Sequence, residues 1–342
     1  MAAADNKDDG IVQLAHGGGG RLMQQLIRDI FATAFERVGL DTRHDAAVLE
    51  LPNSRIACTT DSFVVDPLFF PGGDIGRLAV YGTVNDLAMR GARPYSLTAG
   101  FILEEGLPLR DLRRIAESMA EACRRCGISL VSGDTKVVER GHGHGVYINT
   151  SGIGVLEHDR QIGPDAIAAG DSLIVNGDLG RHGLAIMACR EELALETTIE
   201  SDCAPLHDSV LDLIDAGIEV HCLRDLTRGG LVSALVELSE AAGGEIALEQ
   251  AVLPIVPQVA AACELLGFDP LAVANEGRFV AIVPPEQKLE TLEIIRASSE
   301  AFHPVVIGTV RSLNRPLVTI RSPHGTERVI DMLTGDQLPR IC

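Results

Sequence analysis

Hydrophobic positions recur along the chain with two spacings that alternate from one segment to the next. Apolar residues at intervals of three and four predict helices over 21–35, 74–89 and 109–126. Apolar runs between turn residues predict strands at 47–51, 55–60, 96–103, 128–138 and 146–156. We therefore predict a Gly-rich arm and first helix over 1–42, followed by an α/β domain over 43–160.

A segment with Pro and several Gly, 163–170, predicts a linker, after which the pattern partly restarts. Strands are expected at 172–176, 277–283, 305–310 and 317–320, and helices at 183–190, 205–216, 229–242 and 286–299. This indicates a second α/β domain over 165–330, so the fold class is α/β (α+β) with two domains. Residues 331–342 have no apolar period and contain Gly335 and Pro339, which predicts a flexible tail that ends at Cys342.

The charge of the chain limits its partners. Lys and Arg total 29 against 48 Asp and Glu, a net charge of −19 that disfavours nucleic acid and anionic membranes. A phosphate ligand would therefore need bridging cations or clustered backbone N–H groups. The 8 Cys show no dense, paired spacing of the kind that a disulfide framework has. We see neither a leader sequence nor an apolar run of membrane-spanning length, so we expect a cytoplasmic protein with reduced thiols.

Five aspartates lie at expected turns or element ends, namely Asp45, Asp61, Asp86, Asp134 and Asp225. Taken singly, each is more simply a cap or a turn former. If several converge, their hard oxygen ligands would bind Mg²⁺, through which an acidic protein could hold ATP phosphates. Both interpretations remain open on spacing alone.

Other segments carry candidate chemistry of the same kind. Lys136 would share a strand face with Asp134, where it either contacts phosphate or forms an ordinary ion pair. The run Gly17, Gly18, Gly19 and Gly20 precedes a helix, which suits either an anion or a hinge. In Asp225-Leu-Thr-Arg228-Gly-Gly, Thr227 and Arg228 could contact phosphate, or the segment could be a capped helix start.

Three further features have a simple and a chemical interpretation. Glu276, in Asn275-Glu276-Gly277, is either a turn residue or a buried acid–base group. Cys123-x-x-Cys126 has zinc-like spacing but no second pair, and Gly141-His-Gly-His-Gly is more simply a hairpin loop than a metal tract. Cys342 would be the most accessible thiol if the tail is flexible, or its position is an accident of sequence.

The motifs HDAAV, TTDSF, VNDLAM, SGDTKVV, DLTRGG and NEG, in this order, resemble one superfamily over nearly the whole chain. That superfamily contains aminoimidazole ribonucleotide synthetase, thiamine-monophosphate kinase, selenophosphate synthetase and the HypE hydrogenase maturation factors. The beginning, AHGGGGRLMQQLI, and the ending, PRIC, resemble the HypE family. The reactive Cys or selenocysteine and partner Lys of selenophosphate synthetase have no counterpart near the N-terminus.

The resemblance implies a two-domain PurM-like fold whose N-terminal domains pair their sheets in a homodimer. It implies that Asp45, Asp61, Asp86 and Asp134 hold Mg²⁺ and ATP, with Lys136 near the phosphates. Asn85, Thr135, Asp225 and Arg228 would complete the nucleotide contacts, and Gly17 to Gly20 would close over the nucleotide. HypF would load a carbamoyl group onto Cys342, and the HypC–HypD complex would receive cyanide for the iron of a [NiFe] hydrogenase.

These expectations define a reaction, the ATP-dependent dehydration of a carbamoyl group on Cys342 to a thiocyanate. Phosphorylation makes the carbamoyl oxygen a good leaving group, Lys136 offsets charge, and a base removes protons from nitrogen. We predict Glu276 as that base, with Lys136 or an aspartate as the rival. Two alternatives are an ATP-dependent superfamily enzyme acting on a free small molecule and a non-catalytic scaffold for maturation partners.

Overall fold

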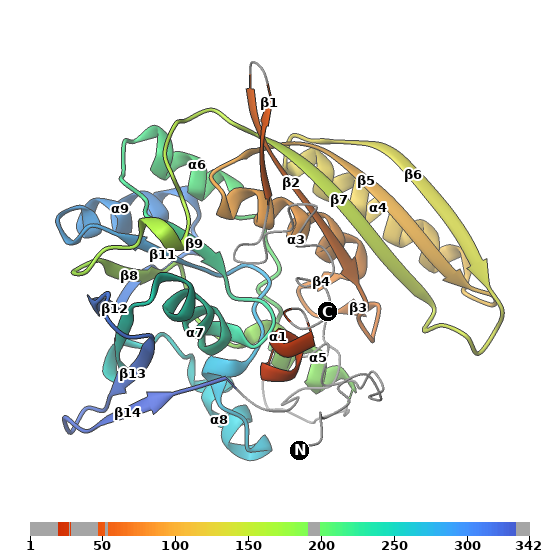
Figure 1. Cartoon of the computed structure of the whole chain (residues 1–342). Helices are drawn as coiled ribbons and strands as arrows, with labels where there is room; N and C mark the ends of the chain where they lie inside the picture. The colour runs from red at the N-terminus through yellow and green to blue at the C-terminus, as the bar shows by residue number, and fades with distance from the viewer. Residues whose placement is uncertain (1–19, 27, 29–46, 52–53, 191–198, 333–342) are drawn as a thin grey trace, which may run out of the picture.

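The structure, a computed structural model, describes residues 20–26, 28, 47–51, 54–190 and 199–332 (Figure 1). Its first sheet has the strand order β1-β2-β7-β5-β6, in which β5 and β6 are parallel and the other neighbours are antiparallel. The strands are β1 (Ala47–Leu51), β2 (Ser54–Phe63), β5 (Arg93–Glu104), β6 (Ser129–Val138) and β7 (Val146–Leu156). A two-stranded sheet of β3 (Phe69–Phe70) and β4 (Gly73–Asp74) follows β2 in the chain.

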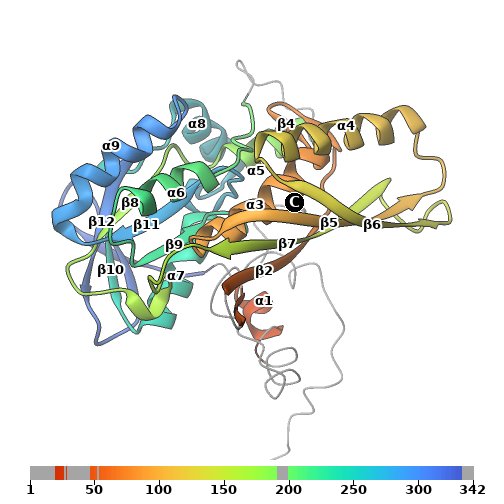
Figure 2. The same cartoon turned by 90° about the horizontal axis from the view of Figure 1, so that it is seen from above.

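One face of the first sheet is covered by α3 (Ile75–Met89) and α4 (Leu109–Arg125), as Figure 2 shows. Buried and more accessible residues alternate along β7, which is the pattern of a strand with one covered face. Ile148 lies in the core beneath the helices. On the opposite face, Ile102 and Ile153 stay 44% and 41% exposed. The first sheet therefore has an open face that carries apolar side chains.

Helix α3 connects the two halves of the molecule. It begins at the cap residue Asp74, whose carboxylate accepts the N–H of Gly76 at 2.8 Å and the hydroxyl of Ser118 on α4 at 2.7 Å. At its other end, Ala88 and Met89 pack in one apolar cluster with residues of the second domain. The two domains are thus joined through a shared core.

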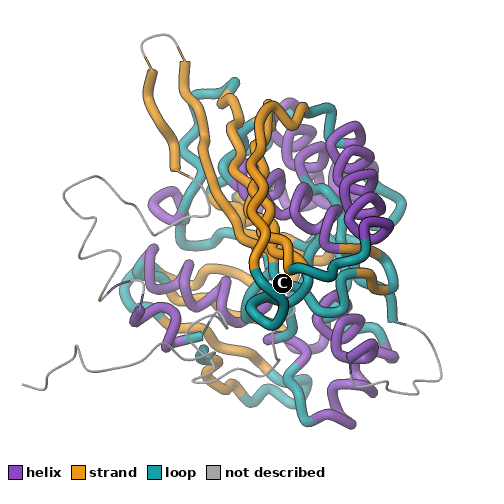
Figure 3. Tube along the Cα trace, turned by 90° about the vertical axis from the view of Figure 1, so that its right-hand side faces the viewer, coloured by secondary structure: helices purple, strands orange, loops and turns teal. Residues whose placement is uncertain are grey.

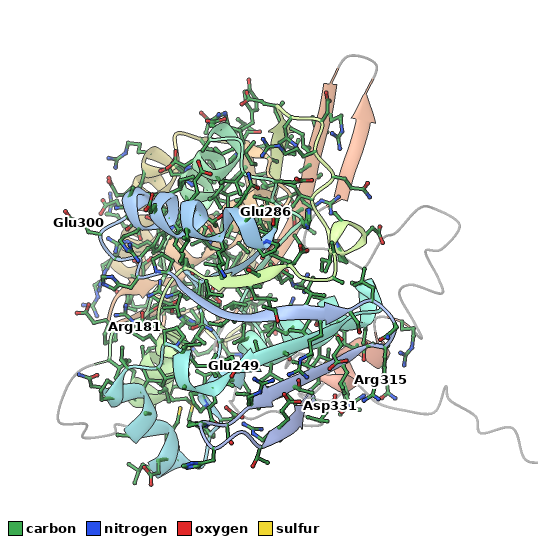
Figure 4. All side chains as sticks on the ribbon, turned by 90° about the vertical axis from the view of Figure 1, so that its left-hand side faces the viewer. Arg181, Glu249, Glu286, Glu300, Arg315 and Asp331 are labelled. Carbon is green, nitrogen blue, oxygen red and sulfur yellow. The ribbon has the colours of Figure 1, made fainter. Side chains whose placement is uncertain are left out.

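The second sheet has the order β14-β13-β10-β12-β8-β11-β9 and lies between helices. Along β11, Val280 and Ile282 pack on the side of α7 (Gly230–Ala242), whereas Phe279 and Ala281 pack on the side of α6 (His207–Asp215) and α9 (Lys288–Ser298). Figure 3 shows the helices around the sheets, and Figure 4 shows α9 between Glu286 and Glu300. The strands are β8 (Ser172–Val175), β9 (Cys222–Asp225), β10 (Glu245–Glu249), β11 (Phe279–Val283), β12 (Val305–Ser312), β13 (Leu317–Arg321) and β14 (Glu327–Ile330).

The remaining helices show where the sequence patterns were informative. Helix α5 (Arg181–Arg190) was predicted to within two residues, but α8 (Pro257–Leu266) was missed because its apolar residues do not stand out from the apolar segment around it. Helix α1 (Arg21–Leu26) is the described part of the first predicted helix. None of the described helices is long and apolar enough to cross a membrane.

The first two residues of the expected tail contact the rest of the protein. Met332 is buried in the core of the second domain, and Asp331 forms an ion pair with Arg21 of α1. A free tail from residue 331 is therefore wrong for these two residues. The rest of the predicted tail, including Cys342, lies outside the described residues.

One added methyl group should affect the free energy of unfolding differently on the two faces of the first sheet. A Cβ at Gly152 would lie 2.7 Å from Thr83 of α3, whereas one at Gly100 would meet only the carbonyl of Asn149, at 3.9 Å. We expect Gly152→Ala to lower the free energy of unfolding by about 1–3 kcal/mol through overpacking. The control Gly100→Ala should change the free energy of unfolding of the monomer by less than about 0.5 kcal/mol. Equal effects in chemical denaturation would contradict this assignment of faces.

Candidate active site at the domain junction

The first-domain half of the candidate site consists of two aspartates on β2 and α3. Asp86 accepts the hydroxyl of Thr59 at 2.8 Å, which holds it against β2. Asp61 lies two residues beyond Thr59, on the same strand face. A Cβ added to Gly82 of α3 would lie 3.7 Å from the Asp61 carboxylate. Asp61 and Asp86 therefore face the same side, and they lie within β2 and α3 rather than in the expected turns.

The second-domain half is built around the turn that carries Glu276. Asp202 accepts the backbone N–H of Glu276 at 3.3 Å and of Gly277 at 3.1 Å. A Cβ on Gly277 would lie 2.0 Å from the carbonyl oxygen of Asp202, so only glycine fits there. The guanidinium of Arg278 lies 4.0 Å from Asp202, and its side chain is also buried. Asn275 accepts the N–H of Gly180 at 2.7 Å and donates to Leu226.

Acids from both domains converge on Glu276, which is only 4% exposed. Burial is the main reason why the pKa of Glu276 is raised well above its ordinary value of 4.5. Negative charge on Asp225, Asp202 and Asp61 raises this pKa further, and the positive charge of Arg228 opposes the shift. Because Asp61 belongs to the first domain, the junction brings together four of the predicted site residues, Asp61, Asp225, Arg228 and Glu276.

Asp134 and Lys136 are not part of this group within one chain. They share a strand face, as predicted, and form an ion pair at 2.6 Å on β6, where their side chains are 71% and 69% exposed. The ion pair with Lys136 lowers the pKa of Asp134. β7 and β5 separate β6 from β2, a span of about 14 Å at ordinary strand spacing.

The sheet register also places the two aspartates on opposite faces. Asp134 aligns with Gly100 and, through it, with Asn149 of β7 on the open face. Asp61 pairs with Thr150, which is buried on the helix side. One protomer therefore cannot gather Asp61, Asp86 and Asp134 around one ion. Thr135, next to Asp134, aligns with Phe101.

Asn85 lies at the junction with both ends of its amide engaged by backbone. It donates to the carbonyl of Ala204 at 3.1 Å and accepts the N–H of Leu206 at 2.8 Å. It therefore holds second-domain backbone, a contact that the motif alone did not indicate. Gly20 precedes α1, and its carbonyl accepts the N–H of Gln24. The other predicted site residues, Gly17, Gly18, Gly19, Asp45 and Cys342, lie outside the described residues.

The Gly229–Gly230 pair explains part of the DLTRGG motif. Both glycines have positive φ, and a Cβ on Gly230 would lie 2.6 Å from the carbonyls of Leu271 and Val273. Asp225 ends β9 and is buried, whereas Arg228 is exposed. The helix start thus needs glycine for packing, and the same turn presents a guanidinium beside the buried acids.

Among the described residues, no three carboxylate, imidazole or thiol groups are arranged to hold a metal ion. This includes Cys123, Cys126, His142 and His144; burial raises the pKa of the Cys126 thiol to about 12. A nucleotide-bound Mg²⁺ needs only one or two protein carboxylates, because water and phosphate oxygens fill its other positions. Asp61 and Asp86 are suited to that smaller role.

Asp202 is the site residue that sequence reasoning missed. It lies in an irregular segment between predicted helices, without a motif or a period to mark it. Its side chain is fully buried, yet it accepts two backbone N–H groups and lies beside Arg278. Only the tertiary contacts reveal this role.

Comparisons with known proteins match both halves of the chain to one family. The family model for the AIR synthase related protein, N-terminal domain, matches residues 43–156, and the model for its C-terminal domain matches 168–320. The carbamoyl dehydratase HypE of Azotobacter vinelandii is 49% identical over 98% of both chains. A structure described as the HypE–HypF complex has a TM-score of 0.84 at 44% identity, and covers 90% of this chain and 99% of its own. Hydrogenase maturation protein HypE in complex with ATP has a TM-score of 0.82 at 41% identity, covering 97% and 100%.

The raised pKa of Glu276 predicts a stability effect that depends on pH. As pH rises above 4.5, the unfolded chain loses the Glu276 proton while the folded state keeps it, so the free energy of unfolding falls. The fall is about 1.4 kcal/mol for each pH unit up to the raised pKa. Glu276→Gln removes this titration, so we expect its melting temperature relative to the unsubstituted protein to be higher at pH ~8 than at pH ~5. A difference that is the same at both pH values would contradict the assignment.

Proposed function

Because this chain belongs to the HypE family of carbamoyl dehydratases, we propose that it performs ATP-dependent dehydration of a carbamoyl group carried on its own Cys342. The relatives support dehydration with ATP in hydrogenase maturation. The site assignment is supported by the electrostatic influence on buried Glu276 of Asp61, from the first domain, and Asp225, from the second.

The proposed reaction turns an S-carbamoyl group into a thiocyanate. The carbamoyl oxygen takes the terminal phosphoryl group of ATP and leaves with it as inorganic phosphate, and ADP is the other product. The nitrogen loses two protons as the C≡N bond forms. The thiolate of Cys342 is a tolerable leaving group, with an ordinary thiol pKa of about 8.5, so the carrier can give up its cyanide.

Asp61 and Asp86 would hold Mg²⁺, together with Asp45, on the nucleotide phosphates. Bound there, the ion would neutralise charge on the phosphoryl group. The negative charge gathered at the junction supports this assignment, since it raises the pKa of Glu276 and a cation would relieve it. Arg228, exposed beside the same acids, is suited to a phosphate oxygen, and the Gly17–Gly20 run would close over the nucleotide.

Glu276 would remove protons from the carbamoyl nitrogen. An ordinary carboxylate is too weak a base for this task near neutral pH, and a raised pKa makes it stronger. Burial and the neighbouring aspartates provide that shift. At rest Glu276 keeps its proton, so it would act as a base only after a cation at the junction lowers its pKa and this proton leaves to solvent.

We further propose that two copies pair the open faces of their first sheets, and that Asp134 and Lys136 serve the site of the partner copy. Both residues lie on the open face, about 14 Å from β2 within one chain. Exposed Ile102 and Ile153 on this face would be buried by such pairing. The homodimer would thus explain why Lys136 is separated from the acids at the junction.

The proposed partners follow from the relatives. A solved relative is described as a HypE–HypF complex, which supports HypF as the protein that loads carbamoyl onto Cys342. The HypC–HypD complex would accept the cyanide. The alternative of a scaffold without catalysis is disfavoured by the buried Glu276, because a scaffold does not need a carboxyl group with a raised pKa.

Replacing the proposed carrier should separate chemistry from nucleotide binding. We expect Cys342→Ala to abolish thiocyanate formation and to leave ATP affinity unchanged. Mass spectrometry of the terminal peptide, after incubation with HypF, carbamoyl phosphate and ATP, should show loss of one water from the carbamoylated form of the unsubstituted protein. A variant that still turns over ATP to release cyanide would point to a free small-molecule substrate instead.

Mixed dimers would test whether Lys136 acts across the interface. Lys136→Ala and Asp61→Asn should each cripple the chemical step, because one removes the cation and the other a proposed Mg²⁺ ligand. If the partner copy supplies Lys136, co-refolding the two variants should restore activity, since a mixed dimer contains one intact site. Mixed dimers as inactive as the single variants would show that the residues act within one chain, and an unchanged rate for Lys136→Ala would remove it from the site.

A further inference from the structure

Residues 201–206, which we call the strap, lie between the two domains and contact both of them. On the first-domain side, the N–H of Ser201 donates to the carbonyl of Pro71 at 2.8 Å, and Asn85 of α3 holds Ala204 and Leu206. On the second-domain side, Asp202 accepts the N–H groups of Glu276 and Gly277. In return, the N–H of Ala204 donates to the carbonyl of Glu276 at 3.2 Å.

The fit on both sides is too tight for the strap to shift freely. A Cβ on Gly72 would lie 2.5 Å from the carbonyl oxygen of Ser201, and one on Gly277 would lie 2.0 Å from that of Asp202. The Leu206 side chain is buried in the cluster that α3 shares with the second domain. Backbone close packing and buried hydrogen bonds therefore set the distance between α3 and the Glu276 turn.

We propose that Asn85 and Asp202 are positioning residues that act through the strap to hold Glu276 at a fixed place relative to Asp61 and Asp86. Neither residue needs to contact the nucleotide or the carbamoyl group. Asn85 is adjacent to Asp86 on α3, so the same helix that presents one acid also anchors the strap. Asp202 completes the connection because its carboxylate receives the backbone of the Glu276 turn.

This inference rests on the proposed role of Glu276. It predicts that substitutions of Asn85 and Asp202 do not have independent effects on the rate. If Asn85 and Asp202 act through one element, releasing either end should displace Glu276, and releasing both should add little. A misplacement of about 1 Å can slow a reaction by roughly 10²-fold. Residues that act independently would instead have rate effects that multiply.

A double-mutant cycle tests the proposal. Asn85→Leu and Asp202→Asn should each lower kcat for thiocyanate formation by roughly 10- to 100-fold, with the ATP-binding stoichiometry of the unsubstituted protein and an unchanged KM for ATP. The double variant should be no slower than the slower single variant. Losses that multiply would overturn the proposal, as would single variants with unchanged kcat.

Asp171→Asn is the matched control, because Asp171 is also buried and accepts a backbone N–H, from Ala168 at 2.7 Å, but faces His221 instead. Any factor by which Asp171→Asn lowers kcat should multiply with the factor for Asp202→Asn. If Asp202→Asn does not fold, Gly72→Ala displaces the strap from the first-domain side and replaces it in the cycle with Asn85→Leu.

Amide hydrogen exchange in the resting protein separates this inference from the proposed function. In Asn85→Leu, the Leu206 N–H loses its acceptor, and we expect exchange at both Leu206 and Gly277 to accelerate beyond any change in global stability. If exchange at the Gly277 N–H changes no more than global stability does, the proposed role of the strap is overturned. Absence of thiocyanate from the unsubstituted protein would instead refute the proposed function and leave the exchange result intact.

Discussion

A buried carboxyl group at the meeting of two domains is the constraint on which the rest of this structure depends. Burying a charge without a partner costs several kcal/mol, so such a group is either paired or held neutral. Asp202 is paired, since it accepts two backbone N–H groups beside Arg278. Glu276 is held neutral, since burial and three neighbouring acids raise its pKa. The negative charge gathered at the junction would therefore stabilise a bound cation.

The fold keeps that junction rigid. Helix α3 covers the first sheet, presents Asp86 to it, and ends among apolar residues of the second domain. The strap then ties α3 to the Glu276 turn through backbone contacts. Because both connections are buried, the acids of the two domains cannot move apart without unpacking a core. In the proposed chemistry the carrier group on Cys342 would therefore have to come to the site, because the site itself stays closed.

Much of this could be predicted from sequence because it depends on local pattern. The helical spacing of α3 and α4 and the apolar run of β7 were visible directly. The ordered Asp, Gly and Asn motifs pointed to Asp61, Asp225 and Glu276, which act on one another electrostatically at the junction. The pairing of Asp134 with Lys136 followed from their spacing on a strand. Short strands such as β9 and β10 were missed, because a strand of so few residues is too short to show a repeating pattern of apolar positions.

The site as an assembly could not be predicted, because tertiary contacts decide it. Asn85 resembles a ligand by its motif, yet its amide serves the backbone of a segment more than a hundred residues away. Asp202 has no motif at all. The sheet register, which places Asp134 on the face opposite Asp61, depends on β7 and β5 lying between their strands. Such relations exist only once distant segments are packed together.

The most direct test is a crystal structure with Mg²⁺ and a non-hydrolysable ATP analogue. We expect the terminal phosphate to lie beside Asp61 and Asp86 of one copy, with Lys136 of the other copy and the Cys342 sulfur both within reach of it and Glu276 close by. A nucleotide bound away from the domain junction, or a Cys342 thiol held in a core remote from the phosphates, would contradict it.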